Sequence, residues 1–251
     1  MNLNNSKTKK IISYSIWGII LIILAIFFIR VGLWERKYYA EKEGSPRAVA
    51  ESHASATSID ETPPTEEEVA NWASTLPENN PAYISLGAIG QIGRQVTSVG
   101  TDENGAMGTP FNVYQLGWYT ASSAPGQGGV GVYDGHNGGP NVYGVLKKLP
   151  LLCPEGEVGT RTVPSDPEQG SSECTGEGDV IAIERADGTS FVYTVVENTT
   201  VPLEKSDDYM TTAFTTPVHG KEAITIITCT GEWSETRGTY LSRQFLRAIL
   251  K

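Results

Sequence analysis

The sequence predicts an all-β domain, a closed barrel or a sandwich, that follows an N-terminal membrane anchor. Two observations predict the β fold: about eight short β-type runs after residue 81, and the Gly, Pro, Asn and Asp residues that separate them. A third is the Asp187-Gly188 pair between two apolar runs, which is typical of a hairpin turn. The expected strands are residues 82–86, 95–99, 115–119, 129–133, 179–185, 190–196, 223–229 and 240–250.

Composition excludes several classes of protein. The 251 residues carry a formal net charge of −10, and 39% of them are hydrophobic. This is enough apolar material for a core but too little for a multi-span membrane protein. Binding to nucleic acid is also disfavoured, because phosphates require clustered Lys and Arg, and no such cluster occurs after residue 42.

The first element is an apolar segment at residues 11–29, nineteen uncharged residues between Lys10 and Arg30. At about 1.5 Å per residue such a helix crosses a hydrocarbon core of about 30 Å, so we expect one transmembrane helix. A cleaved signal peptide is the alternative, but the segment is longer than a usual signal core and no cleavage site follows. Basic residues flank both ends, so charge alone leaves the orientation open.

Residues 30–80 have the composition of a juxtamembrane segment and an acidic, solvated stalk. Within it, Thr65 and the acidic residues that follow predict a short helix over residues 66–76. Within the β domain, residues 81–251, a second helix is expected at residues 142–149. There Val142, Val145, Leu146 and Leu149 recur at helical spacing.

An insertion interrupts the β domain at residues 150–178, a segment rich in Glu, Gly, Ser and Pro without hydrophobic periodicity. We expect a surface loop. Cys153 and Cys174 stand near its ends, where a disulfide would restrict the unfolded chain and contribute about 3 kcal/mol. Free surface thiols and a metal clip are the alternatives.

The third cysteine, Cys229, ends an apolar β run, and a strand end can hold a nucleophile rigidly. His136 also ends a β run, among glycines, and Arg243 lies in the last run. A lone cysteine after a strand is more often a buried small side chain. Together, however, the three supply the nucleophile, proton carrier and cation that acyl transfer through a thioester requires.

These motifs resemble those of the sortases, membrane-anchored cysteine transpeptidases of bacterial surfaces. The segment from Thr225 to Cys229, TIITC, is similar to the family's T-L-x-T-C signature, with Ile in place of Leu. Gly135-His136 follows an apolar strand, and Arg243 lies fourteen residues beyond the cysteine, as in the family. The GWY stretch at residues 117–119 and the segment 214–218 resemble the class F branch. The insertion departs from the family, whose members have a short turn there.

The resemblance implies a closed eight-stranded sortase-type barrel with one or two short helices, outside the cytoplasm, and a cytoplasmic segment at residues 1–10. It implies that Cys229 is the nucleophile, His136 the acid and base, and Arg243 the oxyanion-binding cation, with Thr228 contacting substrate. The substrates would be surface proteins with a C-terminal Leu-Pro-x-Thr-Gly-like signal, joined to an amine of a peptidoglycan precursor. No cofactor or metal is required, although some relatives bind calcium through loop carboxylates, here Glu204, Asp207 and Asp208.

Several alternatives stay open at this stage. His219 competes with His136, and Arg247 competes with Arg243 because it lies on the same strand face. Trp118 and Trp233 are candidates to line a peptide groove, although aromatic residues of a barrel are more often core. The domain could also be a non-catalytic peptide-binding module tethered to a membrane, or a cysteine hydrolase that releases the acyl group to water.

Overall fold

The computed structural model describes residues 59–101, 106–139, 141–164, 166–216 and 218–251. The expected transmembrane segment at residues 11–29 and the cytoplasmic segment at residues 1–10 lie outside the described residues. Within the described ranges, no helix has the length and apolar character needed to cross a membrane.

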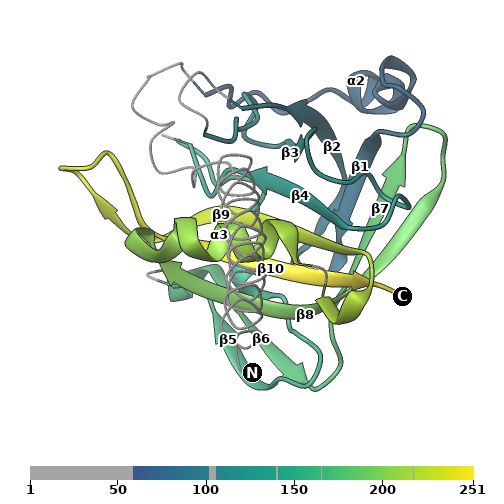
Figure 1. Ribbon diagram of the computed structural model, residues 1–251. Coiled ribbons are helices and arrows are strands. Elements are labelled where there is room, and N and C mark those ends of the chain that lie inside the picture. The colour runs from purple at the N-terminus through teal and green to yellow at the C-terminus, as the bar shows by residue number, and fades with distance from the viewer. Residues whose placement is uncertain (1–58, 102–105, 140, 165, 217) are drawn as a thin grey trace, which may run out of the picture. The chain divides into compact units, whose positions relative to one another are not determined.

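The chain forms a closed eight-stranded β-barrel, which confirms the predicted fold class (Figure 1). All eight expected strands are present, and several extend further than the sequence patterns indicate. The order around the barrel is β1-β2-β3-β4-β9-β10-β8-β7. The barrel strands are β1 (Pro81–Leu86), β2 (Gln91–Val99), β3 (Leu116–Tyr119), β4 (Val130–Gly135), β7 (Val180–Arg185), β8 (Ser190–Pro202), β9 (Ala223–Ser234) and β10 (Thr239–Leu250).

Two hydrophobic clusters lie on opposite faces of the barrel wall. The interior cluster contains Ile224 and Ile226 of β9, and Leu246 of β10. The outer cluster contains Ile227 of β9 and Phe245 of β10. Successive residues of a strand point to opposite faces of the sheet. Because both faces of β9 and β10 are covered by apolar clusters, the sequences of these strands are nearly continuous apolar runs.

The outer cluster is covered by helix α3 (Ser206–Thr215), which lies across β9 and β10 in Figure 1. Met210 and Ala213 of the helix are fully buried in this cluster. Thr225 of β9 donates a hydrogen bond from its hydroxyl to the carbonyl of Ala213, at 2.7 Å. The face of β9 that carries Thr225 and Ile227 is therefore the face toward α3.

The helix predicted at residues 66–76 is present in a shorter form, α2 (Glu66–Asn71), followed by the 3-10 helix Ala73–Thr75. Thr65 caps α2 in a reciprocal capping box with Glu68. This part of the expected solvated stalk packs on the barrel. The Trp72 indole donates to the carbonyl of Val96 at 3.1 Å, and the Tyr83 hydroxyl donates to the carbonyl of Val69 at 2.5 Å.

The prediction of a helix at residues 142–149 is wrong. The segment forms turns that end in the 3-10 helix Leu149–Leu151. Its amides are committed to the end of β4, because Gly144 donates to the carbonyl of Asn137 and Leu146 to that of His136. Pro150 also disfavours helical backbone at Leu149. The apolar pattern reflects burial instead, since Leu146 and Leu149 are fully buried in the core. The remaining 3-10 helices are Gly87–Ile89, Pro167–Gln169, Leu203–Lys205 and Val218–Gly220.

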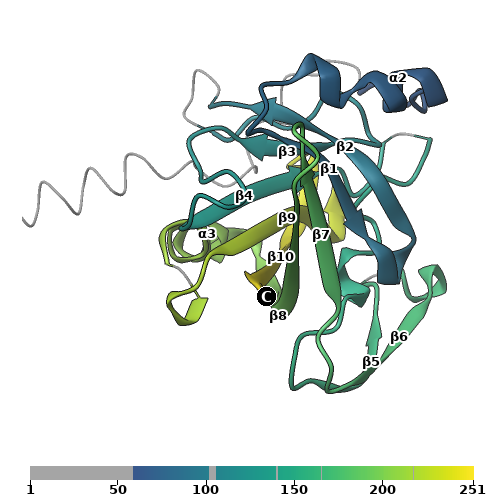
Figure 2. The same cartoon turned by 90° about the vertical axis from the view of Figure 1, so that its right-hand side faces the viewer.

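The insertion is not an irregular loop as expected, because it contains an antiparallel hairpin of β5 (Val158–Thr162) and β6 (Ser171–Thr175). Figure 2 shows this hairpin projecting from one end of the barrel. Its strands are short, polar and largely exposed, which is why they give no hydrophobic alternation. Cys153 and Cys174 form a disulfide across the insertion.

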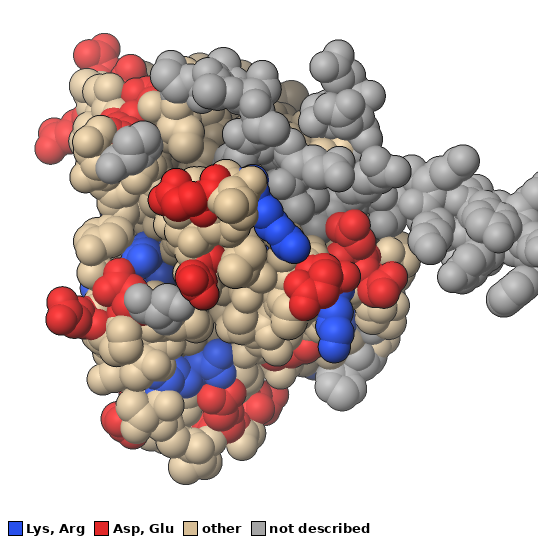
Figure 3. All heavy atoms as spheres, turned by 90° about the vertical axis from the view of Figure 1, so that its left-hand side faces the viewer, with Lys and Arg blue, Asp and Glu red and all other residues tan. Residues whose placement is uncertain are grey.

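Charged side chains are dispersed over the surface. On the face drawn in Figure 3, acidic side chains of the described residues are interspersed with basic ones rather than gathered into one patch. Elsewhere among the described residues, charges of opposite sign form ion pairs, such as Lys147 with Asp166 at 3.0 Å. The excess of acid therefore creates no single-sign surface on this face.

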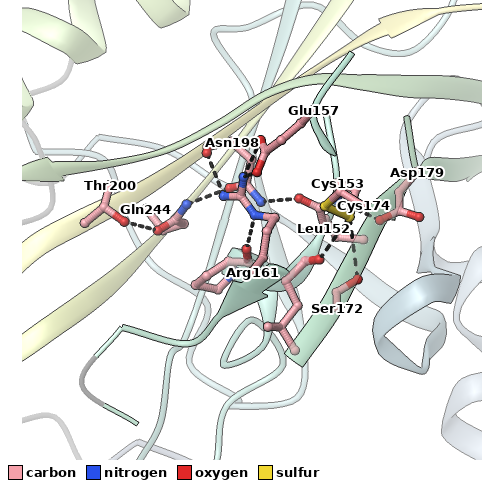
Figure 4. Close-up of polar contacts among 12 residues, drawn as sticks. Leu152, Cys153, Glu157, Arg161, Ser172, Cys174, Asp179, Asn198, Thr200 and Gln244 are labelled. Atoms are coloured by element: carbon pink, nitrogen blue, oxygen red, sulfur yellow. Dashed lines mark hydrogen bonds and ion pairs between the residues drawn. A yellow bond between two sulfur atoms is a disulfide. The ribbon is translucent and has the colours of Figure 1, made fainter. Parts of the chain in front are cut away.

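A polar network attaches the insertion to the barrel (Figure 4). Arg161 of β5 donates to the carbonyls of Pro150 at 2.7 Å and of Asn198 at 2.8 Å, and pairs with Glu157. The Asn198 amide donates to the carbonyls of Leu149 and Leu152, and Gln244 of β10 donates to Asn198 at 2.6 Å. Hydrogen bonds thus fix the insertion to two barrel strands, β8 and β10, and the disulfide closes the insertion on itself.

Candidate active site

Three neighbouring strands bring together the residues predicted to carry chemistry. Arg243 of β10 is the register partner of Cys229 of β9. Strand β4 runs parallel to β9, with Asp134 opposite Ile227. Counting two residues on from this pair along both strands brings His136 level with Cys229. His136 is the first residue after β4.

Strand alternation places all three side chains on the α3 side of the barrel wall. Cys229 lies on the same face of β9 as Ile227, and Arg243 lies on the same face of β10 as Phe245. Ile227 and Phe245 both belong to the cluster under α3. His136 shares its face with Val132 of the same cluster. The β pairing therefore gathers a thiol, an imidazole and a guanidinium just beyond this apolar cluster.

Cys229 is partly buried and is the cysteine that takes no part in the disulfide. Burial raises the pKa of its thiol because the thiolate loses solvation. The nearby Arg243 cation opposes this shift, whereas Asp134 adds to it. Burial thus favours the thiol form of Cys229, whereas the Arg243 cation favours its ionisation.

His136 is buried, with 6% of its surface exposed. Its Nε2 atom lies 2.6 Å from the carbonyl oxygen of Pro110. A carbonyl can only accept, so Nε2 carries the hydrogen and the neutral ring has Nδ1 as its acceptor nitrogen. Burial lowers the pKa of this imidazole, partly offset by the bond to Pro110, and so favours the neutral base.

Arg243 is fully buried. Its guanidinium donates to the carbonyls of Tyr240 and Ser242, each at 3.0 Å, and to the hydroxyl of Thr239 at 3.2 Å. Its buried Nε–H has no hydrogen-bond partner, and none of the described carboxylates forms an ion pair with it. The guanidinium therefore lies beside Cys229 with one unsatisfied donor.

Arg247, the alternative cation, is engaged elsewhere. It is the register partner of Thr225, four residues before Cys229, and donates to the carbonyl of Thr216 at the end of α3. Its guanidinium also lies 3.8 Å from the carboxylate of Glu197. The structure therefore gives Arg247 a role in holding α3 and β8 rather than a place beside the thiol.

The two residues expected to contact substrate face the barrel interior instead. Thr228 is buried, has the opposite parity to Cys229, and donates to the carbonyl of Gly135 at 2.8 Å. It therefore ties β9 to the end of β4. Trp118 of β3 belongs to the interior cluster, and its indole donates to the carbonyl of Ser123 at 3.3 Å. Neither side chain lines the surface around Cys229.

The structure gives the remaining candidates separate positions. His219 lies in the 3-10 helix Val218–Gly220, before β9. Glu204 belongs to the 3-10 helix Leu203–Lys205, and Asp207 and Asp208 to the first turn of α3, where acidic residues favour the helix dipole. Among the residues whose placement is described, no three His, Cys, Asp or Glu side chains group as a metal site.

Sequence reasoning missed one residue of this site, Asp134. It lies two residues before His136 on the same face of β4 and is 2% exposed. Neither carboxylate oxygen has a hydrogen-bond partner, and burial raises its pKa well above the usual range. A period-two count back from His136 places Asp134 on this face, although an Asp directly before a glycine is also typical of a turn.

The chain is similar in fold to solved sortase structures. No curated protein matches the chain. Among solved structures, it is similar to a pilus-related sortase C of Group B Streptococcus, with 17% identity over 70% of this chain and 69% of that chain, and a TM-score of 0.44. Sortase C1 from Streptococcus agalactiae is 22% identical over 75% and 77%, with a TM-score of 0.44. Sortase A from Corynebacterium diphtheriae is 20% identical over 86% and 80%, also at 0.44.

The match to a family model is more specific than these similarities. The sortase domain model matches residues 89–250, well over half of the chain. This range contains every barrel strand after β1, together with Cys229, His136 and Arg243. The chain therefore belongs to the sortase family, whose members are cysteine transpeptidases.

Proposed function

We propose that this chain is a membrane-anchored transpeptidase that cleaves a Leu-Pro-x-Thr-Gly-like sorting signal and joins the acyl product to a cell-wall amine. The observation that supports it best is the placement of Cys229 on β9 between the strands that carry His136 and Arg243. A nucleophile, a proton carrier and a fixed cation then share one face of the barrel.

In the first step, Cys229 Sγ attacks the Thr–Gly carbonyl carbon while its proton passes to Nδ1 of His136. An S–C bond forms, and negative charge develops on the carbonyl oxygen. The unpartnered Nε–H of Arg243 is the donor available to that oxygen. The C–N bond then breaks, and His136 returns its proton to the departing amine, which leaves a thioester on Cys229.

In the second step, an amine attacks the thioester carbonyl carbon and transfers a proton to His136. The C–S bond breaks, a new amide forms, and the proton returns from His136 to the Cys229 thiolate. The same imidazole thus accepts and donates a proton in each half-reaction. A lowered pKa suits this role because the ring is a neutral base when the reaction begins.

The proposal places the catalytic domain outside the cytoplasm, anchored to the cell membrane through residues 11–29. The disulfide of the insertion supports this placement, because disulfides persist in oxidising compartments and are rare in the cytosol. Membership of the class F branch is part of the same proposal and is supported by the GWY stretch at residues 117–119.

The test uses the full chain in mild detergent with a Leu-Pro-x-Thr-Gly peptide and triglycine. Mass spectrometry follows both the new amide and the peptide released. Cys229→Ala should abolish both products. Two matched pairs test the other roles, His136→Ala against His219→Ala, and Arg243→Gln against Arg247→Gln. In each pair, the first variant should lose at least about a hundredfold in rate, the usual size of an acid–base or oxyanion contribution.

Each outcome separates the candidate functions. Turnover that persists in Cys229→Ala would refute the proposal. Release of peptide without the new amide, even at saturating triglycine, would indicate a hydrolase. Peptide binding without release by the unaltered chain would indicate a non-catalytic binding module. A greater loss in Arg247→Gln than in Arg243→Gln would reassign the cation.

A further inference from the structure

A cavity of about 320 Å³ lies beside the candidate active site, between the end of β4, the insertion and the β9–β10 hairpin. Asn137, the residue after His136, lines it, and so does Thr230, the residue after Cys229. The cavity therefore begins one residue from each of these two reactive side chains.

Two largely buried polar residues present their side chains to this cavity. Asn137 is 6% exposed and Thr230 is 3% exposed, and neither side chain forms a hydrogen bond with the described residues. Neither is among the sealed, unsatisfied polar groups of the described residues, so the amide and the hydroxyl are reachable from the cavity and can bond a ligand there. An amide and a hydroxyl are suited to the C=O and N–H groups of a peptide.

The insertion supplies a second wall of the cavity. Val163, Pro164 and Asp166 line it, and Asp166 is positioned by its ion pair with Lys147 at 3.0 Å. The Arg161 network holds β5, which leads into this wall, against the barrel, and the disulfide closes the insertion on itself (Figure 4). A preorganised wall binds a ligand without a further ordering cost.

The β9–β10 hairpin supplies an aromatic third wall. Trp233 is 46% exposed and packs edge-to-face on Tyr240, with ring centroids 5.3 Å apart. Glu232 and Asp166 bring two carboxylates to the lining against the single cation of Lys147. Exposed aromatic faces and an excess of carboxylate both favour a cationic ligand.

We propose that this cavity binds the acceptor, a peptide that carries a primary amine, and that the insertion is its binding element. The inference rests on the proposed function. The cavity's lining residues Asn137 and Thr230 adjoin His136 and Cys229 in the chain, so an acceptor bound there lies next to the thioester and to the group that takes its proton. The acceptor amine attacks the thioester carbonyl, its proton goes to His136, and the C–S bond breaks.

The test separates acylation from transfer in the full chain. Acylation is followed as thioester formation with the Leu-Pro-x-Thr-Gly peptide in the absence of amine. Transfer is followed as amide product against concentration of triglycine and of an Ala-Lys-Ala peptide. Three variants each change one wall of the cavity. They are Asp166→Asn in the insertion, Trp233→Ala in the β9–β10 hairpin, and Thr230→Val next to Cys229. The matched controls are Glu168→Gln, which removes a carboxylate of the insertion outside the cavity, and the exposed Phe111→Ala.

Each cavity variant should raise the half-saturating amine concentration about tenfold, the effect of one lost polar or aromatic contact, and change acylation less than about twofold. The controls should change neither. Intact acylation with unchanged amine saturation in all three variants would overturn this inference alone. Equal losses in both steps would also overturn it, because they would indicate a general structural effect. An unaltered chain that forms no thioester would overturn the proposed function as well.

Discussion

Replacing Asp134 with asparagine should stabilise the folded chain, and the gain should increase with pH. Asp134 is 2% exposed, and both of its carboxylate oxygens are buried without a hydrogen-bond partner. Its register partner is Gly117, where an added Cβ would lie 2.3 Å from the Asp134 Oδ1 atom. Such a site accommodates a neutral carboxylic acid or an amide of the same shape, but attraction to the Thr109 hydroxyl and to its own backbone N–H offsets only part of the hydration that a carboxylate loses.

The size of the effect follows from proton linkage. Burial raises the pKa of Asp134 well above 3.8 in the folded chain, whereas the unfolded chain keeps an ordinary carboxyl group. Between the two pKa values the unfolded chain has released a proton that the folded chain still holds. The free energy of unfolding therefore falls by about 1.4 kcal/mol for each pH unit in this window. Asp134→Asn abolishes this loss, and above the folded-state pKa the difference between the two proteins becomes constant.

Urea denaturation of the full chain and of the variant, at half-unit steps from pH 4 to pH 8, measures this difference. The two should differ least at the acid end, which lies close to the ordinary pKa of the carboxyl in the unfolded chain, and should diverge as pH rises. Asp187→Asn is the control, because Asp187 is exposed and its ion pair with Arg185 lowers its pKa. That control should not diverge over this range. A constant offset between Asp134→Asn and the unaltered chain would refute the reasoning, since it would mean that the native carboxylate is ionised throughout.

Three further predictions concern the thiol, the insertion and one glycine. Arg243→Gln should slow alkylation of Cys229 by iodoacetamide several-fold at pH 7, because the cation that lowers the thiol pKa is lost; an unchanged rate would contradict the placement of the guanidinium. Replacing both disulfide cysteines with serine should cost about 3 kcal/mol in urea denaturation, from the freed loop of 20 residues between them, and an unchanged midpoint would contradict this. Gly117→Ala should cost about 1–3 kcal/mol through contact with Asp134, whereas Gly100→Ala, with open space around its Cβ, should be neutral; equal stabilities would refute the packing argument.

The barrel strands could be predicted because their patterns depend on local chemistry. Each expected strand is a short apolar run between turn residues, and all eight pair in the barrel. Strand ends were less predictable. Residues 197–202 extend β8 with the polar sequence ENTTVP, which remains extended because it pairs with β10 rather than because of its own pattern. Long-range pairing of this kind leaves no local signal.

The candidate site was only partly predictable. Motif spacing predicted Cys229, His136 and Arg243, and the register brings these three positions side by side. The side on which a residue points follows from the period of two. This rule already assigns Thr228 to the face opposite its neighbour Cys229, and the structure shows it there. Trp118 had no such signal, because all four residues of β3 are buried and its two faces look alike.

Parallel pairing explains how the insertion can be tolerated between His136 and Cys229. Strands β4 and β9 are neighbours in the barrel but are not joined by a turn, so the number of residues between them does not set their register. The register is set instead by their hydrogen bonds and by the Thr228 contact to Gly135. An insertion within the connection can therefore fold separately, as a hairpin closed by a disulfide, without displacing the site. One of its attachments runs from Arg161 through Asn198 to Gln244, the neighbour of Arg243, which lets the insertion build a wall of the cavity beside Cys229 while the reactive groups stay on the barrel.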